Sequence, residues 1–309
     1  MKVKSLTILV TLRCPASCAH CAVHSSPRRR EKIEPGLARQ AVEEAAASGL
    51  NIVLSGGEAM LCPTLVFDLA TRASLHGVSV AVYTNGFWAT TPARAERMTQ
   101  SLTEAGVDCL LLSTDAFHLP FVPVTRVENA CRAAAATGMT VEVAVPSRPA
   151  DREAAAALAR LRRIPGVLVR SHGIARAGRA ANLELDNFCS GIPDAPCHVL
   201  GQLALGPDGT LYACCAAAIG FGPASPLCAG RFGERSLAQL IARLDRRILL
   251  DDIQTEGPLR AAFHEARRNP AFSFEFAESY TDQCAACRAV CAAYGEGEAR
   301  TMMQGEVHA

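Results

Sequence analysis

Over the first 175 residues, six short runs of aliphatic and β-branched residues alternate with alanine-rich amphipathic stretches. The runs predict strands at 5–12, 51–54, 78–83, 109–113, 140–145 and 167–171, and the stretches predict helices at 35–48, 64–76, 92–105, 124–137 and 150–162. Strands that are each followed by a helix pair in parallel, through right-handed crossovers. The alternation therefore predicts an α/β fold, and both an open sheet and a curved partial barrel satisfy it.

Charge and composition exclude several classes of function. The 309 residues carry 31 basic and 30 acidic side chains, so we expect no nucleic-acid partner and no binding to a membrane surface. No apolar run approaches the roughly 18 residues of a transmembrane helix. Arg13 interrupts the first apolar run, which favours a buried strand over a secretion signal. We therefore expect a cytoplasmic protein, in which clustered thiols among the 14 cysteines bind metal more often than they pair.

Unusual residues directly follow each predicted strand. They occupy 14–21, 55–58, 84–86, 114–118, 147–148 and 172–173. In parallel α/β folds, the carboxyl ends of the strands meet at one edge and carry the binding site. We therefore expect the functional site at this edge of the sheet.

Cys14, Cys18 and Cys21 place three thiols in the loop after the first predicted strand. Three thiolates hold three irons of a 4Fe–4S cluster, whose usual complement is four cysteines. The fourth iron then keeps an open coordination position, at which a substrate or cofactor can bind. Zinc is the alternative, but zinc sites usually build on a C-x2-C or C-x4-C pair with two further ligands elsewhere. The spacing therefore favours an iron–sulfur cluster.

The C-x3-C-x2-C loop, joined to Gly56-Gly57-Glu58 after the second strand, resembles the radical S-adenosylmethionine (radical SAM) superfamily. The resemblance covers residues 5–175 and implies a partial (β/α)6 TIM-like barrel. It implies that the three cysteines bind a 4Fe–4S cluster and that S-adenosyl-L-methionine chelates the open iron. Members of the family cleave this cofactor reductively to methionine and a 5′-deoxyadenosyl radical, which abstracts hydrogen from the substrate.

The same resemblance implies contacts with the cofactor. Gly56, Gly57 and Glu58 would meet its methionine amino group, because glycines let the backbone approach closely and a carboxylate supplies an acceptor. Asn85 and Ser113, which follow or end the third and fourth strands, would also contact the cofactor. The site therefore draws on the ends of four strands.

Three polar side chains near these motifs have open roles. His20 stands between the last two cysteines, where family members often have an aromatic residue near the adenine. Asp115 and His118 either touch the substrate or form a hydrogen-bonded pair that closes their loop.

Beyond about residue 185 the chain becomes rich in proline, glycine and cysteine. The elements expected there are a hairpin of strands 203–205 and 210–213 and helices near 236–250 and 259–267. We therefore expect two domains, a partial barrel over 1–184 and a Cys-rich α+β extension over 185–309.

The C-terminal cysteines resemble the twitch and SPASM extensions of radical SAM enzymes, which carry auxiliary iron–sulfur clusters. The implied ligands of one auxiliary 4Fe–4S cluster are Cys197, Cys214, Cys284 and Cys287, with Cys215 or Cys291 as substitutes. A structural zinc is the alternative, because tetrathiolate zinc has similar spacing.

Five cysteines fall outside these sets. Three roles are open to Cys189 and Cys228. Each is an extra cluster ligand, a thiol that returns a hydrogen atom to a substrate radical, or an inert buried residue. The remaining three are expected in the core: Cys62, Cys109 and Cys131.

The resemblance to enzymes with this domain arrangement implies modification of a ribosomally made precursor peptide, by epimerisation or cross-link formation. A dehydrogenase acting on a protein side chain or a small-molecule alcohol is the alternative within the superfamily. An iron–sulfur redox sensor or carrier is the alternative of another class, but it gives no reason for Gly56-Gly57-Glu58. The expected partners are the peptide, an electron donor such as flavodoxin or ferredoxin, and a separate protein that recognises the leader peptide.

Overall fold

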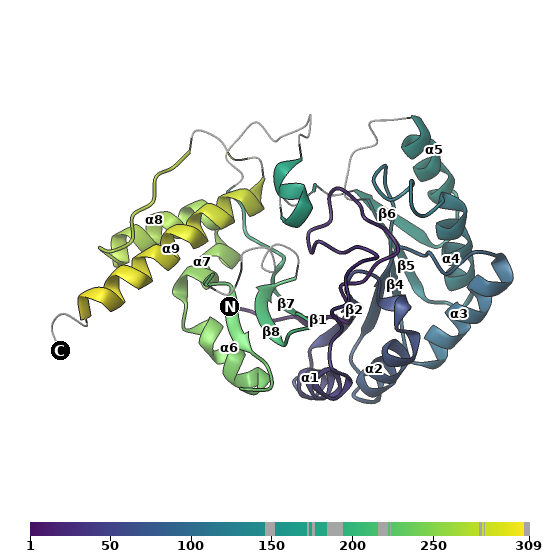
Figure 1. The fold of residues 1–309 in the computed structure, drawn as a ribbon, viewed down its shortest axis with the longest axis horizontal. Helices are drawn as coiled ribbons and strands as arrows, with labels where there is room; N and C mark the ends of the chain where they lie inside the picture. The colour runs from purple at the N-terminus through teal and green to yellow at the C-terminus, as the bar shows by residue number, and fades with distance from the viewer. Residues whose placement is uncertain are drawn as a thin grey trace.

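A nine-stranded sheet forms the centre of the computed structural model, which describes residues 1–145, 152–171, 173–174, 177–183, 194–215, 222, 224–277, 280 and 282–305 (Figure 1). The strands are β1 (Ser5–Leu9), β2 (Asn51–Ser55), β3 (Val80–Thr84), β4 (Cys109–Ser113), β5 (Thr140–Val145), β6 (Val167–Ser171), β7 (Leu200–Leu205), β8 (Thr210–Cys214) and β9 (Cys228–Arg231). Their order is β6-β5-β4-β3-β2-β1-β7-β8-β9. Strands β1 to β7 pair in parallel, whereas β8 and β9 are antiparallel to their neighbours. The sheet is open, as in a partial barrel.

Helices connect the parallel strands and lie along the outer side of the curved sheet (Figure 1). They are α1 (Pro35–Ala47), α2 (Pro63–Leu75), α3 (Pro92–Glu104), α4 (Val124–Ala136) and α5 (Arg152–Leu161). This arrangement confirms the predicted α/β fold. It also places the carboxyl ends of β1 to β6 at one edge, where the loops between strand and helix carry the unusual residues.

Local sequence explains where these helices begin and end. Proline occupies the first position of α1, where no hydrogen-bonded N–H is needed. The carboxylate of Glu34 accepts hydrogen bonds from the backbone N–H groups of Gly36 (2.8 Å) and Leu37 (2.6 Å). Gly49, at φ +74°, lets the chain leave α1 in a left-handed conformation. One face of α1 is buried against the sheet through Ala38, Ala41, Val42 and Ala45.

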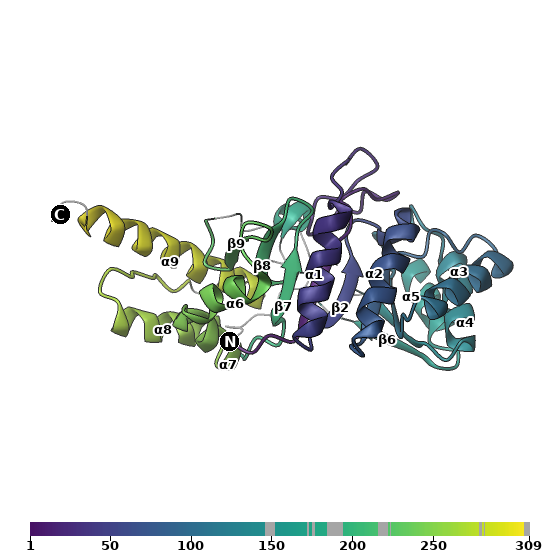
Figure 2. The same ribbon diagram turned by 90° about the horizontal axis from the view of Figure 1, so that it is seen from below.

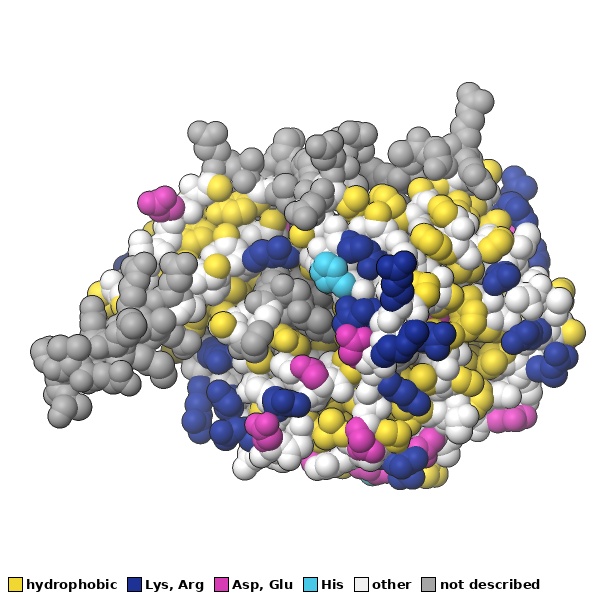
Figure 3. All heavy atoms as spheres, viewed as in Figure 1, with side chains coloured by type: hydrophobic (Ala, Val, Ile, Leu, Met, Phe, Trp, Pro, Cys, Tyr) yellow, Lys and Arg dark blue, Asp and Glu magenta, His cyan; other side chains and the backbone are white. Residues whose placement is uncertain are grey.

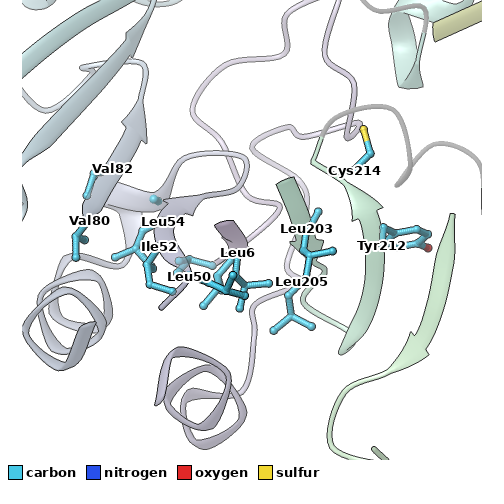
Figure 4. Close-up of a cluster of buried hydrophobic side chains, with 14 of the residues drawn as sticks. Leu6, Leu50, Ile52, Leu54, Val80, Val82, Leu203, Leu205, Tyr212 and Cys214 are labelled. Carbon is cyan, nitrogen blue, oxygen red and sulfur yellow. The ribbon is translucent and has the colours of Figure 1, made fainter. Parts of the chain in front are cut away.

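The C-terminal part of the chain extends the same sheet. Strand β7 pairs in parallel with β1, with Ser5 opposite Gln202 and Ile8 opposite Leu205. Leu203 and Leu205 point toward Leu6 in a shared hydrophobic cluster (Figure 4). The sheet and its core therefore cross the expected boundary at residue 184, and the division into two domains stays a prediction.

Four helices complete the C-terminal part: α6 (Leu237–Asp245), α7 (Ile248–Thr255), α8 (Pro258–Arg268) and α9 (Gln283–Gly305). Helices α8 and α9 lie side by side and extend away from the sheet (Figure 2). No helix in the described part of the chain combines the length and apolarity that crossing a membrane requires.

Several predicted bounds need correction. The first strand ends at Leu9 rather than at residue 12, because the following residues form only isolated bridges, Thr11 with Lys32 and Arg13 with Ser26. The helix expected at 236–250 is two helices, α6 and α7. Strand β9 was not predicted from the sequence.

Candidate functional site

A cavity of about 810 Å³ lies at the carboxyl ends of the parallel strands. Gly56, Gly57, Asn85 and Ser113 line it, together with eight thiols: Cys14, Cys18, Cys21, Cys197, Cys214, Cys215, Cys284 and Cys287. The two cysteine sets lie more than 170 residues apart in the sequence. The fold therefore brings both predicted sets to one cavity.

The N-terminal thiols lie in a loop that supplies hydrogen-bond donors to their sulfur atoms. Cys14 Sγ accepts from the backbone N–H of Ala16 (3.4 Å) and from Asn85 Nδ2 (3.6 Å). Cys21 Sγ accepts from the backbone N–H of Ser25 (3.3 Å). Burial raises the pKa of Cys14 to about 12, so its thiolate needs a bound cation in place of the proton. These donors and this burial fit a metal cluster.

The spacing of the thiols can be compared with that of a zinc site. A tetrahedral zinc site with Zn–S bonds near 2.3 Å brings its sulfur atoms to about 3.8 Å from one another. In the part of the chain that the structure describes, no three thiols lie within 4.8 Å of one another. A 4Fe–4S cluster binds each thiolate to a separate iron and so requires wider spacing. No group of three thiols in the described residues therefore has the spacing of a preformed tetrahedral zinc site.

Gly56 and Gly57 bring the loop after β2 into contact with the cysteine loop. A Cβ atom on Gly56 would lie 2.3 Å from the Thr11 carbonyl oxygen, and one on Gly57 would lie 2.5 Å from the Arg13 carbonyl oxygen. The backbone N–H of Gly57 donates to the Thr11 carbonyl (2.6 Å). The two glycines are thus required for loop packing as well as for an open cavity wall.

Glu58 lies beneath the cavity wall and is 1% exposed. Its Oε1 accepts from Thr84 Oγ1 (2.6 Å), and its Oε2 accepts from the backbone N–H of Asn85 (2.8 Å). Burial raises the pKa of Glu58 to about 7. Glu58 therefore anchors the loop that carries Asn85, while its predicted contact with the methionine amino group stays a prediction.

His20, Asp115 and His118 form a buried network beside the cysteine loop. Asp115 Oδ1 lies 2.9 Å from His118 Nδ1, and Asp115 Oδ2 lies 3.2 Å from His20 Nε2. His20 also stacks on Phe117, with ring centroids 5.0 Å apart. Burial opposes a charged His118, but hydrogen bonds with Asp115 and Cys18 raise its pKa to about 10. The structure shows Asp115 and His118 as a hydrogen-bonded pair that also includes His20. His118 lines the cavity as well, so its contact with a substrate stays a prediction.

The C-terminal thiols come from three elements. Cys197 precedes β7, Cys214 ends β8, and Cys284 and Cys287 lie in the first turns of α9. Burial raises the pKa of Cys284, and the charges of Cys214, Asp282 and Cys287 raise it further. A bound cation relieves such repulsion between neighbouring thiolates. These four thiols therefore fit a metal-binding role.

The two substitute ligands differ in position. Cys215 lines the cavity, and its Sγ donates to Gln202 Oε1 at 3.6 Å. Cys291 does not line it, and its Sγ lies 3.9 Å from that of Cys287. Cys215 is the substitute that shares the cavity with the four expected ligands.

A family model for the radical SAM superfamily matches residues 8–146, which include the cysteine loop, both glycines and Glu58. Residues 8–146 therefore form a radical SAM domain. The predicted resemblance is thus confirmed for the part of the chain that forms β1 to β5.

One relative and two solved structures are also similar to this chain. YydG of Bacillus subtilis (strain 168), whose name assigns it to peptide biosynthesis, is 29% identical over 128 residues. The match covers 41% of this chain and 40% of YydG, so it spans about two fifths of that relative's length. A structure of native anSMEcpe with bound AdoMet and Cp18Cys peptide covers 97% of both chains, with 12% identity and a TM-score of 0.55. SuiB of Streptococcus suis, bound to S-adenosylmethionine, covers 93% of this chain and 72% of its own, with 13% identity and a TM-score of 0.44.

The likeness to anSMEcpe supports the fold of this chain over nearly its whole length. It includes the part beyond β6, which the family model does not reach. The fold described above is therefore similar to that of a solved protein over both its N-terminal and its C-terminal parts.

The cysteines outside the two sets are dispersed in the part of the chain that the structure describes. Cys228 lies buried in β9 and is not among the residues that line the cavity, and Cys189 lies outside the described residues. Cys131 is fully buried, as predicted, whereas Cys62 and Cys109 are only half-buried.

Tyr83 and Arg179 are among the cavity residues that were not predicted. Tyr83, in β3, lines the cavity, and burial raises its pKa to about 12. Its position directly before the Thr-Asn-Gly loop was the signal available in the sequence. Arg179 also lines the cavity, and its contacts span more than 150 residues, which no local pattern reveals.

Basic side chains gather near the middle of one face of the protein (Figure 3). Arg28 and Arg30 are exposed in the segment directly after the cysteine loop. Arg29 forms an ion pair with Glu31, with Nη2 and Oε1 2.7 Å apart. Part of the basic run is therefore neutralised within the chain.

Proposed function

We propose that this protein cleaves S-adenosyl-L-methionine reductively and uses the resulting radical to modify a ribosomally made peptide. The observation that carries the proposal is the single cavity lined by both thiol sets and by Gly56 and Gly57. The match of residues 8–146 to the radical SAM family model supports the cofactor chemistry. The name of YydG and the peptide bound to anSMEcpe support a peptide substrate.

Residues around the cavity have distinct roles in this proposal. Cys14, Cys18 and Cys21 hold the 4Fe–4S cluster, and Gly56, Gly57, Glu58, Asn85 and Ser113 form the binding site for the cofactor. A cluster held by these cysteines would supply the electron for reductive cleavage of S-adenosyl-L-methionine. Glu58 keeps Asn85 in place, and Asn85 in turn donates to Cys14 Sγ. The loop after β3 thereby links the cofactor site to the cluster ligands.

Cys197, Cys214, Cys284 and Cys287 hold one auxiliary 4Fe–4S cluster in this proposal. Their shared position on the cavity wall and the electrostatic repulsion between their thiolates support this role. Electrons come from a flavodoxin or ferredoxin, and the exposed Arg28 and Arg30 offer such an acidic protein a basic surface.

Epimerisation requires a hydrogen atom to return to the substrate radical. Cys228 and Cys189 are the donors expected from the sequence, but Cys228 does not line the cavity. Cys215 does line it and carries its proton, because its Sγ donates to Gln202. In this step the S–H bond breaks, a C–H bond forms, and the thiyl radical regains one electron from the electron donor and one proton from solvent. We therefore propose Cys215 as the hydrogen donor.

The proposal is tested by co-expressing the protein with the short peptides encoded beside its gene and measuring peptide masses. Epimerisation in deuterated water adds one mass unit at an α-carbon, because the donor thiol exchanges its proton with solvent. Cross-linking or oxidation in ordinary water removes two mass units. Unchanged peptides, with turnover of a small alcohol instead, would contradict the peptide substrate and favour the dehydrogenase alternative.

A further inference from the structure

Arg179 joins the segment after β6 to the cysteine loop. It lies in the short helix η2 (Gly178–Asn182), beside the long loop after β1 (Figure 1). Its Nε donates to the Cys18 carbonyl oxygen (2.9 Å), and its Nη2 donates to the Ser25 carbonyl oxygen (2.8 Å). Its backbone N–H donates to the Cys21 carbonyl oxygen (3.0 Å). One residue thus contacts the backbone at both ends of the segment that carries Cys18 and Cys21.

The packing around Arg179 leaves little space between η2 and the loop. A Cβ atom on Gly178, which has φ +57°, would lie 2.2 Å from the Ala22 carbonyl oxygen. Ala177 and Ala180 are fully buried. The close backbone packing around Gly178 therefore fixes the position of Arg179, in addition to the hydrogen bonds of the Arg179 side chain.

The cysteine loop needs such partners, because residues 14–25 form no regular helix or strand. Backbone carbonyls in an irregular buried loop require donors from elsewhere in the chain. The planar guanidinium presents several N–H groups in a fixed geometry, which a lysine ammonium does not. It also brings a positive charge to a loop that carries three thiols, and this charge favours the more negative, reduced state of a cluster bound there.

We propose that Arg179 is a positioning residue for the cluster: it holds the cysteine loop in its binding geometry and raises the reduction potential of the cluster through its charge. The inference rests on the proposed function only in requiring that Cys14, Cys18 and Cys21 bind a cluster. It couples the conformation of the segment leading into the C-terminal part to the chemistry at the N-terminal thiols.

Two substitutions of Arg179 separate the effect of its guanidinium hydrogen bonds from the effect of its positive charge. The anaerobically reconstituted Arg179→Gln protein should release iron to a chelator about tenfold faster than the wild type, in line with losing a group that orients a metal ligand. Its midpoint potential, measured by electron paramagnetic resonance, should be more negative. Arg179→Lys should also release iron faster, but its potential should stay near that of the wild type. Arg39→Gln is the matched control, because Arg39 pairs with Asp68 on the surface of α1 and α2 (2.7 Å).

Wild-type iron release and wild-type potential in Arg179→Gln would overturn the inference while leaving the proposed function standing. Should Arg179→Gln fail to fold, judged by circular dichroism of the metal-free protein, iron release from Arg179→Lys decides, and a wild-type rate overturns the inference. A wild-type protein that binds no cluster at the N-terminal thiols would instead contradict the proposed function itself.

Discussion

Glu58 shows how burial changes the chemistry of one side chain at this site. Three donors reach its carboxylate, from Thr84, Asn85 and the backbone N–H of Met60 (3.1 Å). These bonds favour the ionised form, but removal from water opposes it more strongly, so the pKa rises to about 7. Near neutral pH, Glu58 therefore exists in both protonation states beneath the cavity.

This raised pKa predicts a pH-dependent stability of the metal-free protein. Between the usual pKa of 4.5 and about 7, folded Glu58 holds a proton that the unfolded chain has released. Stability should therefore fall as pH rises through this window, with each unit of raised pKa worth about 1.4 kcal/mol. Urea unfolding from pH 4.5 to 8 should show this loss in the wild type and not in Glu58→Gln. Parallel pH profiles for the two proteins would contradict the prediction.

Cys215 and Cys228 should differ in their effect on hydrogen return to the substrate radical. Cys215→Ala should bind iron and cleave S-adenosyl-L-methionine as the wild type does, yet fail to complete epimerisation, because the cavity loses its donor thiol. Cys228→Ala should epimerise normally, since Cys228 does not line the cavity. Mass spectrometry of the peptide in deuterated water distinguishes them. Normal deuterium gain with Cys215→Ala would show that another group returns the hydrogen atom.

At the scale of elements, the site depends on close packing between loops. The loop after β2 reaches the cysteine loop through Gly56 and Gly57, and η2 reaches it through Gly178. Each contact brings a glycine against a backbone carbonyl, where a side chain has no room. The geometry of the three thiols is therefore set by neighbouring loops as well as by β1.

Gly56→Ala tests this packing, with Gly138→Ala as its control. Both glycines have positive φ, at +145° and +82°, but a Cβ atom on Gly138 meets nothing within 4 Å. Gly138→Ala should cost about 1–2 kcal/mol from backbone strain alone. Gly56→Ala should cost about 3 kcal/mol or more, because the loop must also move away from Thr11. Urea unfolding of the metal-free proteins measures both, and equal losses would contradict the packing account.

Local sequence patterns predicted the parallel elements well, because each element carries its own signals. The expected strands at 109–113, 140–145 and 167–171 coincide with β4, β5 and β6. Strand β9 escaped prediction because it has only four residues, including a glycine, and exists through its pairing with β8. The division between α6 and α7 escaped prediction because the apolar pattern continues across Arg246 and Arg247.

For the whole molecule, the central feature is one cavity that receives thiols from both ends of the chain. Strand β7 pairs with β1, and this pairing brings the C-terminal cysteines beside the N-terminal loop. Motif spacing predicted which thiols matter. It could not predict their shared cavity, the burial of Glu58 or the contacts of Arg179, because these depend on pairing and packing between distant segments.

The N-terminal and C-terminal cysteines should form two metal centres that assemble independently of each other. A Cys14/Cys18/Cys21 triple Ala protein, reconstituted without oxygen, should retain about four irons per chain, and a Cys197/Cys284 double Ala protein should also retain about four. Elemental analysis and electron paramagnetic resonance provide the measurement. One zinc and almost no iron in the triple Ala protein would establish a structural zinc site in place of the auxiliary cluster.

The proposed function requires that the N-terminal thiols support radical chemistry on S-adenosyl-L-methionine. The most direct measurement is the release of 5′-deoxyadenosine by the anaerobically reconstituted protein after reduction with dithionite. The wild type should release it, and single Ala substitutions of Cys14, Cys18 or Cys21 should abolish its release while the fold survives. Release at the wild-type rate from any of these variants, or none from a wild type that holds its full complement of iron, would contradict the claim.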